Sequence, residues 1–300
     1  MKTTIIIDGG LGRQITAIPA LEKYVKKNPD TIIISHFWTQ IVYGNPILQD
    51  KIYDVSTKGL FDIVKDSKII RPEPYYNTDY INGRINLIDA FNQEINQDNE
   101  KLSIPKLYLT YVELEIGRNK IQPNHQKVLC FQPFGSTANF SKDSVIDTSI
   151  RSLTKDAMLH IIHRMKKANI KVALYDDRQI PFLNYDDVLN MGQGSCRDWA
   201  GVIANCHYFL GVDSSGQHIA RTFNIPGVVI IGGTNANNIS YPDHFTIIEK
   251  DNAINKKYMS LRLCDFDYKM SEFYNGDLMN FDKNDIDQIC DLVINNINRL

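Results

Sequence analysis

The sequence predicts an α/β protein with two domains, each built on a parallel sheet, and three observations lead to this prediction. Short β-branched runs, such as Thr3–Ile7, alternate along the chain with longer stretches whose apolar residues repeat at helical spacing. The length of 300 residues is enough for two domains, each with its own core. The composition, with 43% hydrophobic and 23% charged residues, is typical of a globular protein.

The first domain is expected to span residues 1–122. Its expected elements are, in order, a strand at Thr3–Ile7, a glycine turn, a helix that reaches Lys27, strands at Thr31–Ser35 and Lys51–Val55, a long helix marked by Ile81 to Ile95, and a linker at Arg118–Gln126. Pro19 lies within the first helical pattern, so this helix either begins near Pro19 or is kinked there.

The second domain is expected to span residues 123–282. Its expected elements are a strand at Lys127–Phe131, a loop at 133–137, a helix capped by Thr154, strands at Lys171–Tyr175 and Val188–Met191, a helix capped by Ser195, a strand at Tyr208–Val212, a short helix from Ser214, and a strand at Gly227–Ile231. Asp198 follows Ser195 by three residues, as in a capping box. Residues 283–300 read as a terminal helix, for which one expected position is against the first domain.

Charge and cysteine content exclude several classes of protein. The 33 Lys and Arg residues nearly balance 35 Asp and Glu residues, so the totals predict no strongly basic face for nucleic acid. The five cysteines are odd in number and form no CxxC pair, which argues against a disulfide framework or a zinc cluster. His160 and His163 have no third ligand nearby in the sequence, so no metal site is expected. No apolar run approaches the roughly 20 residues that cross a bilayer, and we expect a cytoplasmic protein.

Rossmann-like sheets bind ligands at the carboxyl ends of their strands, and three loops are expected there. The first loop contains Gly9, Gly10 and Gly12, which allow a close approach of the backbone, and then Arg13 at a helix start that favours an anion. The alternative is a tight turn without a ligand. The loop is neither a P-loop nor a full GxGxxG fingerprint, because Ile15 takes the third glycine position.

The other two loops follow strands of the second domain. Asp213 ends a strand, and Ser214 and Ser215 begin a helix whose amides and hydroxyls can hold phosphate oxygens, with His218 one turn further on. The alternative is a capping aspartate and a structural histidine. Gly232, Gly233 and Thr234 end the next strand and offer close backbone approach and a hydroxyl, unless they form a plain loop.

The stretch from Asp198 to Asn235 carries a recognisable pattern. It contains Asp-Ser-Ser-Gly-Gln-His at 213–218 and a later strand that ends in Gly-Gly-Thr at 232–234. It resembles the carboxyl half of the heptosyltransferase-like glycosyltransferases (glycosyltransferase family 9), which carry Asp-Ser/Thr-Gly-x-x-His and then Gly-x-Thr at strand ends. Ile18-Pro19-Ala20-Leu21 at the amino end also fits, and the likeness spans most of the chain.

The resemblance implies a GT-B fold, with two Rossmann-like domains facing a central cleft, and an inverting, metal-independent transfer of sugar from a nucleotide-sugar. This donor is a co-substrate, so no cofactor is expected. The acceptor is a glycan or another hydroxyl, by default in lipopolysaccharide. The implied donor site comprises Gly135, Ser136, Thr137, Lys142, Asp213, Ser214, Ser215, His218, Gly233 and Thr234, with Arg197 as a weaker candidate.

Arg13 departs from the family pattern, because the family places an aspartate, the expected base, at this position. Arginine does not accept a proton at neutral pH, so the nearest carboxylate, Asp8, becomes the candidate base on the acceptor side, beside Arg13 and the glycine turn. His36 is a further candidate. Three alternatives stay open: transfer to a hydroxymethylated DNA base, a non-catalytic protein that binds sugar nucleotides, and a sugar-nucleotide epimerase.

Overall fold

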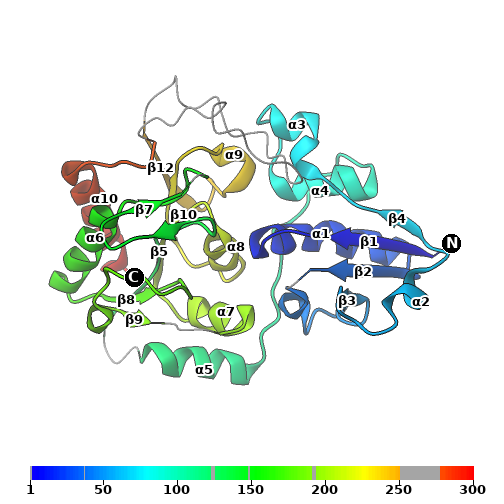
Figure 1. The fold of residues 1–300 in the computed structure, drawn as a ribbon, viewed down its shortest axis with the longest axis horizontal. Coiled ribbons are helices and arrows are strands. Elements are labelled where there is room, and N and C mark those ends of the chain that lie inside the picture. Colours follow the sequence, from blue (N-terminus) through cyan, green and yellow to red (C-terminus); the bar gives the residue numbers. More distant parts are fainter. Residues whose placement is uncertain (1, 37, 123–125, 148, 191–193, 251–277) are drawn as a thin grey trace. The chain divides into compact units, whose positions relative to one another are not determined.

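The computed structural model describes residues 2–36, 38–122, 126–147, 149–190, 194–250 and 278–300 (Figure 1). Two compact units form, Met1–Thr110 and Tyr111–Leu300. The boundary therefore lies earlier than the expected 122/123. Helix α5 (Tyr111–Ile121), whose last turn overlaps the linker expected at Arg118–Gln126, belongs to the second unit.

The first unit contains a parallel sheet. Its elements are β1 (Thr3–Ile7), α1 (Leu11–Lys27), β2 (Thr31–Ser35), β3 (Ile52–Asp54), α2 (Leu60–Val64), β4 (Lys68–Ile70), α3 (Thr78–Ile81) and α4 (Leu87–Asn96). The described strands pair in parallel in the order β3-β2-β1-β4, with Thr3 opposite Thr31. The strand order therefore reverses between β1 and β4, and the loops that follow these two strands lie side by side.

Two helices of the first unit differ from the sequence prediction. Helix α1 begins at Leu11, well before Pro19, so the expected alternative of a start near the proline is wrong. Of the helix expected from Ile81 to Ile95, only the part from Leu87 is helical, as α4. Ile81 is instead the last residue of α3, and Asn86 caps α4 by accepting a hydrogen bond from the amide of Asp89. Apolar spacing continues across this break, so periodicity alone does not reveal it.

The second unit contains a larger parallel sheet. Beyond α5, its elements are β5 (Val128–Gln132), β6 (Asn139–Phe140), β7 (Val145–Ile146), α6 (Lys155–Lys167), β8 (Lys171–Leu174), β9 (Leu189–Asn190), α7 (Cys196–Ala204), β10 (Tyr208–Val212), α8 (Ser215–Thr222), β11 (Gly227–Ile231), α9 (Ala236–Ile239), β12 (Phe245–Glu249) and α10 (Lys283–Ile297). The described strands of the main sheet follow the order β12-β11-β10-β5-β8-β9, and β6 and β7 form a separate antiparallel hairpin. Met191, the last residue of the strand expected at Val188–Met191, lies outside the described residues.

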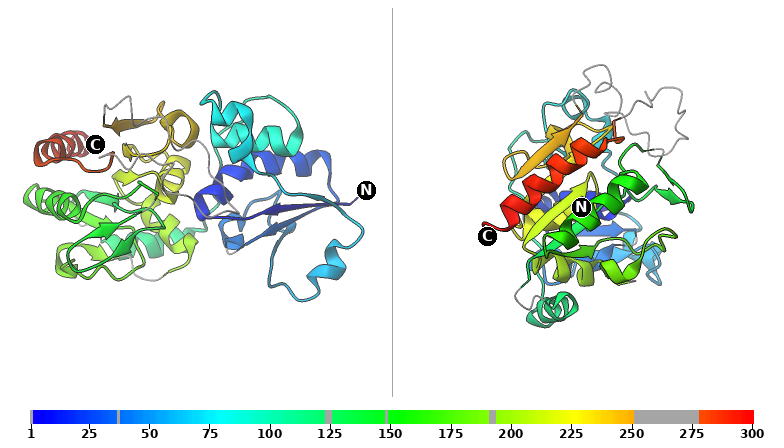
Figure 2. Two further views of the ribbon diagram at one scale, coloured as in Figure 1. Left: turned by 45° about the horizontal axis from the view of Figure 1, so that its top comes forward. Right: turned by 90° about the vertical axis from the view of Figure 1, so that its left-hand side faces the viewer.

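Three predicted caps and helices of this unit are confirmed. Thr154 accepts a hydrogen bond from the amide of Ala157 at the start of α6. Ser195 and Asp198 form a reciprocal capping box at α7. The terminal helix α10 exists and packs beside α6, within the second unit (Figure 2).

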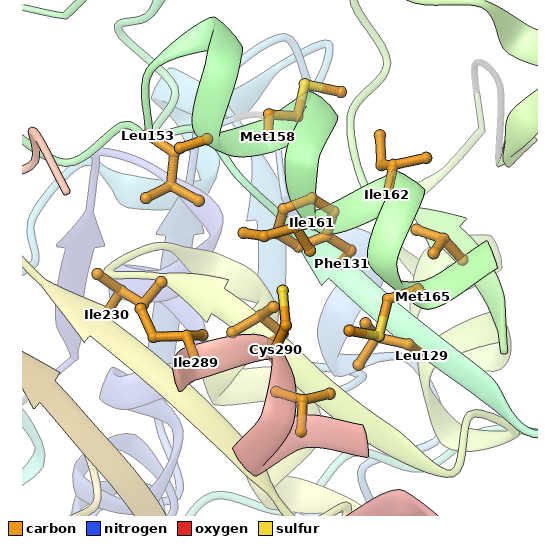
Figure 3. Close-up of a cluster of buried hydrophobic side chains, with 14 of the residues drawn as sticks. Leu129, Phe131, Leu153, Met158, Ile161, Ile162, Met165, Ile230, Ile289 and Cys290 are labelled. Atoms are coloured by element: carbon orange, nitrogen blue, oxygen red, sulfur yellow. The ribbon is translucent and has the colours of Figure 1, made fainter. Parts of the chain in front are cut away.

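The core of the second unit lies between the main sheet and the pair α6 and α10 (Figure 3). Phe131 from β5, Ile161 from α6 and Ile289 from α10 meet there with almost no exposed surface. Alternate residues of the strands, such as Cys130, point to the opposite face of the sheet and are also buried. Burial on both faces explains why these strands read as continuous apolar runs in the sequence.

Helix α5 is fixed to α7 by a close crossing. A Cβ atom at Gly117 would lie 2.3 Å from the backbone of Gly201, and one at Gly201 would lie 2.7 Å from the carbonyl oxygen of Glu113. Arg197 forms an ion pair with Glu113, and its side chain is buried. These contacts make α5 an integral part of the second unit, and they give Arg197 a structural partner there.

Candidate functional site

The strand order of the second unit reverses between β5 and β10. Strands β8 and β9 extend the sheet on one side of this pair, and β11 and β12 extend it on the other. In open α/β sheets, ligands bind outside the carboxyl ends of the strands at such a reversal. The loop after β5, at residues 133–138, and the loop after β10, at residues 213–214, therefore mark the candidate ligand-binding end of this unit.

Side-chain hydroxyls and one carboxylate organise the loop after β5. Ser152 accepts a hydrogen bond from the Gly135 amide at 2.9 Å, and its own hydroxyl donates to Asp147. The hydroxyls of Thr137 and Ser149 donate to the same carboxylate, each at 2.6 Å. Although burial by itself raises the pKa of Asp147, these hydrogen bonds hold it below its usual value. Asp147 is therefore an anion that shapes the loop.

Arg178, which follows β8, contacts the carbonyl side of the same loop. Its Nη atoms donate to the carbonyl oxygens of Gly135 at 3.1 Å and Ala138 at 2.7 Å, and lie 3.4 Å from that of Ser136. The guanidinium also binds the buried carboxylate of Asp176 through Nε and Nη2. No motif in the sequence pointed to this arginine.

At the end of β10, Asp213 is buried and accepts a hydrogen bond from Gln217 Nε2 at 3.1 Å. Ser214 is the N-cap residue of α8, although its side chain makes no capping hydrogen bond. The Ser215 hydroxyl lies 3.1 Å from that of Tyr175, and the Gly216 amide donates to Gln132 Oε1 at 2.9 Å. Part of the start of α8 is thus occupied by the protein's own groups.

His218 is buried and has a structural partner. Its Nδ1 lies 2.9 Å from the hydroxyl of Tyr241. Burial disfavours the charged form and lowers the pKa of His218 to about 4. This histidine is therefore neutral at pH 7.

Arg151 is a cation that the sequence analysis missed. Its Nη1 lies 3.5 Å from the carbonyl oxygen of Asp213, and its Nε donates to the hydroxyl of Ser149 at 3.0 Å. It also borders Gly135, where an added Cβ would lie 3.4 Å from the Cβ of Arg151. Arg151 therefore lies between the loops after β5 and β10. Lys142, the predicted cation, lies exposed between β6 and β7.

The loop after β11 is partly satisfied by the protein itself. The Gly233 amide donates to the carbonyl oxygen of Ile150 at 3.2 Å. The Thr234 hydroxyl oxygen is buried and has no hydrogen-bond partner among the described atoms. Because buried hydroxyls normally have partners, Thr234 is the group of this loop that best suits a ligand.

In the first unit, the predicted glycine turn forms between β1 and α1. Gly9 has a φ of +85°, which favours glycine, Gly10 is the N-cap residue of α1, and Gly12 lies in its first turn. Asp8 Oδ1 lies 3.2 Å from Arg13, and its Oδ2 accepts hydrogen bonds from Arg71 at 2.8 and 3.2 Å. Both oxygens of the candidate base are thus held by guanidinium groups.

Arg13 is a buried member of this cluster. Only 4% of its side chain is exposed, and it donates to both carboxylate oxygens of Glu73 and to the carbonyl oxygen of Pro72. Its guanidinium also lies 5.2 Å from the ring centroid of Tyr75. Burial on its own lowers the pKa of Arg13, but Tyr75, Glu73 and Asp8 together raise it above the usual value. Arg13 is therefore a fixed cation.

The remaining expectations concern metals and membranes. His160 binds Asp287 of α10 at 2.8 Å, which gives it a structural partner. Among the described residues, no group of three or more His, Cys, Asp and Glu side chains is arranged to hold a metal ion. No helix in the described part of the chain combines the length and apolar character needed to cross a membrane.

No protein-family model matches this sequence, and no curated protein matches it significantly. Several solved structures do resemble the fold. A glycosyl transferase of family 9 from Veillonella parvula superposes with a TM-score of 0.66 at 11% identity, over 98% of this chain and 97% of that one. ADP-heptose lipopolysaccharide heptosyltransferase II from Escherichia coli gives 0.57 at 11% identity, over 83% and 90% of the chains.

The third structure is the dodecameric, iron-containing heptosyltransferase TibC of enterotoxigenic E. coli, in complex with ADP-D-β-D-heptose. It gives a TM-score of 0.63 at 13% identity, over all of this chain and 78% of that one. At such low identities the likeness shows a common fold. The chain thus has the α/β fold, with two parallel sheets, of the solved family 9 glycosyltransferases.

Proposed function

We propose that this protein is a glycosyltransferase that takes a sugar from a nucleoside-diphosphate donor and transfers it to a hydroxyl acceptor. The observation that carries the proposal is the position of Arg151. It lies at the carboxyl ends of β5 and β10, between a hydroxyl-rich loop and Asp213. Structures that share the fold include a heptosyltransferase bound to ADP-heptose, which supports a nucleotide-sugar as the donor.

In this proposal, the donor's diphosphate lies against Arg151 and the loop containing Ser136 and Thr137. Negative charge develops on the diphosphate as the sugar leaves, and a guanidinium together with backbone amides stabilises that charge. The Thr234 hydroxyl is a further donor to the phosphate oxygens. Because a protein cation takes this role, we propose transfer without a metal ion. We also propose inversion at the sugar, as the resemblance to family 9 implies.

We propose that Asp8 is the base that takes the acceptor's proton. The side chain of Arg71 is 52% exposed and can move away from Asp8, whereas buried Arg13 holds the other carboxylate oxygen in place. The acceptor would be a hydroxyl of a glycan, such as lipopolysaccharide. We also propose that the protein is cytoplasmic. The four cysteines that the structure describes are buried and free.

A second candidate function is a sugar-nucleotide-binding protein without transferase activity. The observation that favours it is the burial of Arg13 among ion pairs, at the position where the resembling family has an aspartate. Both functions need the same donor site in the second unit. They differ only in whether an added acceptor leads to release of the nucleotide.

The test begins with a thermal-shift screen of the full chain against ADP, UDP, GDP and CDP. A specific nucleotide should raise the melting temperature by mass action, and no response to any of the four contradicts both functions. The sugar derivative of the responding nucleotide is then incubated with glycan acceptors. Nucleotide release that needs the acceptor and is lost in Asp8→Asn supports the transferase, whereas binding without release supports the second candidate.

A further inference from the structure

Arg178 contacts three backbone carbonyl oxygens of one loop, those of Gly135, Ser136 and Ala138. It donates hydrogen bonds to the carbonyl oxygens of Gly135 and Ala138, and it lies 3.4 Å from that of Ser136. The Asp176 carboxylate accepts two hydrogen bonds from the same guanidinium. The centroid of the Phe140 ring lies 4.8 Å from the guanidinium carbon. A guanidinium has five N–H donors in a rigid plane, so it can satisfy these acceptors simultaneously.

The geometry of the peptide bond fixes what the loop presents on its other side. In a trans peptide, the carbonyl of one residue and the N–H of the next point in opposite directions. Because the carbonyls of Gly135 and Ser136 point towards Arg178, the amides of Ser136 and Thr137 point away from it. Both residues are exposed, and neither amide donates to another of the described residues.

The order of the strands shows which elements flank the loop after β5. Arg178 follows β8, and β5 lies between β8 and β10 in the sheet (Figure 1). The amides face away from Arg178 and the β8 side. Arg151, which lies beside Asp213 at the end of β10, also borders this loop at Gly135. Successive amides held in a turn form a concave site for an anion.

We propose that Arg178 is a positioning residue for the donor's diphosphate: it holds the carbonyls of the loop after β5 on one side, so that the Ser136 and Thr137 amides face the phosphate oxygens. This inference rests on the proposed function and deepens it. Arg178 does not touch the ligand, and its effect is transmitted through the loop. Lysine is a poor substitute, because a single ammonium cannot reach two carbonyls and a carboxylate in one plane.

The experiment compares Arg178→Met and Arg178→Lys with a matched control, Arg164→Met. Arg164 belongs to the same unit, its side chain is 26% exposed against 29% for Arg178, and it also binds carboxylates, those of Asp287 and Asp291 on α10. For each variant, affinity is measured for the nucleoside diphosphate that the wild type binds and for the corresponding nucleoside without phosphates.

We expect both Arg178 variants to bind the nucleoside diphosphate about 10- to 100-fold more weakly than the wild type. The reason is that the Ser136 and Thr137 amides, no longer held in place, lose their hydrogen bonds to the charged phosphate oxygens. Their affinity for the nucleoside should stay within twofold of the wild type, and Arg164→Met should change neither affinity. In a third variant, Arg178→Ala, free guanidinium at millimolar concentration should restore part of the diphosphate affinity. Equal losses for diphosphate and nucleoside, or no loss in the Arg178 variants, would overturn the proposal.

A measurement on the wild type avoids any folding defect of the variants. In a ¹⁵N-labelled protein, inorganic pyrophosphate should shift the amide resonances of Ser136 and Thr137 downfield. Pyrophosphate that binds without moving these two resonances contradicts the role of the loop amides. A wild type that binds neither pyrophosphate nor any of the four nucleoside diphosphates instead contradicts the proposed function itself.

Discussion

Glu73→Met removes the main partner of a buried arginine in the first unit. Arg13 loses two hydrogen bonds, at 3.0 and 3.1 Å, and keeps Asp8 and the Pro72 carbonyl. Removing one partner of a fully buried ion pair costs about 3–5 kcal/mol. Because Glu73 is 20% exposed and Asp8 still faces Arg13, we expect a loss of about 2–3 kcal/mol in the free energy of unfolding of this unit.

The protein's two tryptophans allow the two units to be followed separately. Trp38 lies in the first unit and Trp199 in the second, so urea unfolding in a Trp199→Phe background reports on the first unit through Trp38. Arg84→Met is the matched control, because Arg84 pairs with Asp79 on the surface of the same unit. Breaking such an exposed pair should cost less than about 1 kcal/mol.

A double-mutant cycle completes this test. The double variant, Arg13→Met with Glu73→Met, has no buried arginine charge that could lack the Glu73 carboxylate. It should therefore be more stable than Glu73→Met alone. If Glu73→Met costs no more than Arg84→Met, or if the two substitutions are additive, Arg13 is not held as a buried ion pair and the reasoning fails.

Two further predictions concern the second unit. His218 has a pKa of about 4 when folded, against 6.5 for a free histidine, so between these values the unfolded chain binds a proton that the folded chain excludes. The free energy of unfolding should therefore fall as the pH drops from about 6.5 to 4, by up to about 1.4 kcal/mol per pH unit. Urea unfolding of His218→Gln over the same pH range should show a decrease that is smaller by this contribution. Gly201→Ala places a Cβ 2.7 Å from the carbonyl oxygen of Glu113, so it should destabilise the contact of α5 with α7 by about 1–3 kcal/mol. Unfolding followed through Trp199 measures that loss, and a variant as stable as the wild type would show that the helices do not cross so closely.

Strands and caps were predictable because their signals are local. Thr3–Ile7, Thr31–Ser35 and Tyr208–Val212 are strands at the predicted residues, since buried parallel strands are short β-branched runs between turns. The cap formed by Ser195 and Asp198 depends on residues three positions apart. Helix α5 was missed because it is stabilised by α7, which lies far along the sequence.

The candidate site was predictable only where a motif continued along the chain. The sequence placed Asp213 and Ser214 at a strand end, and the loop at 135–137 after another strand. Arg151 and Arg178 were missed, because each reaches the site from a segment without a motif and acts through contacts with distant residues. Glu73 was missed for the same reason, since its contact with Arg13 spans sixty residues.

The donor site that we propose in the second unit is tested most directly by calorimetric titration of nucleoside diphosphates into the wild type, Arg151→Met and Lys142→Met. We expect one bound nucleotide per chain and an affinity reduced about tenfold or more in Arg151→Met. Lys142→Met should change little, because its cation is lost from the exposed β6–β7 turn. Binding that is as tight in Arg151→Met as in the wild type would contradict the proposed site.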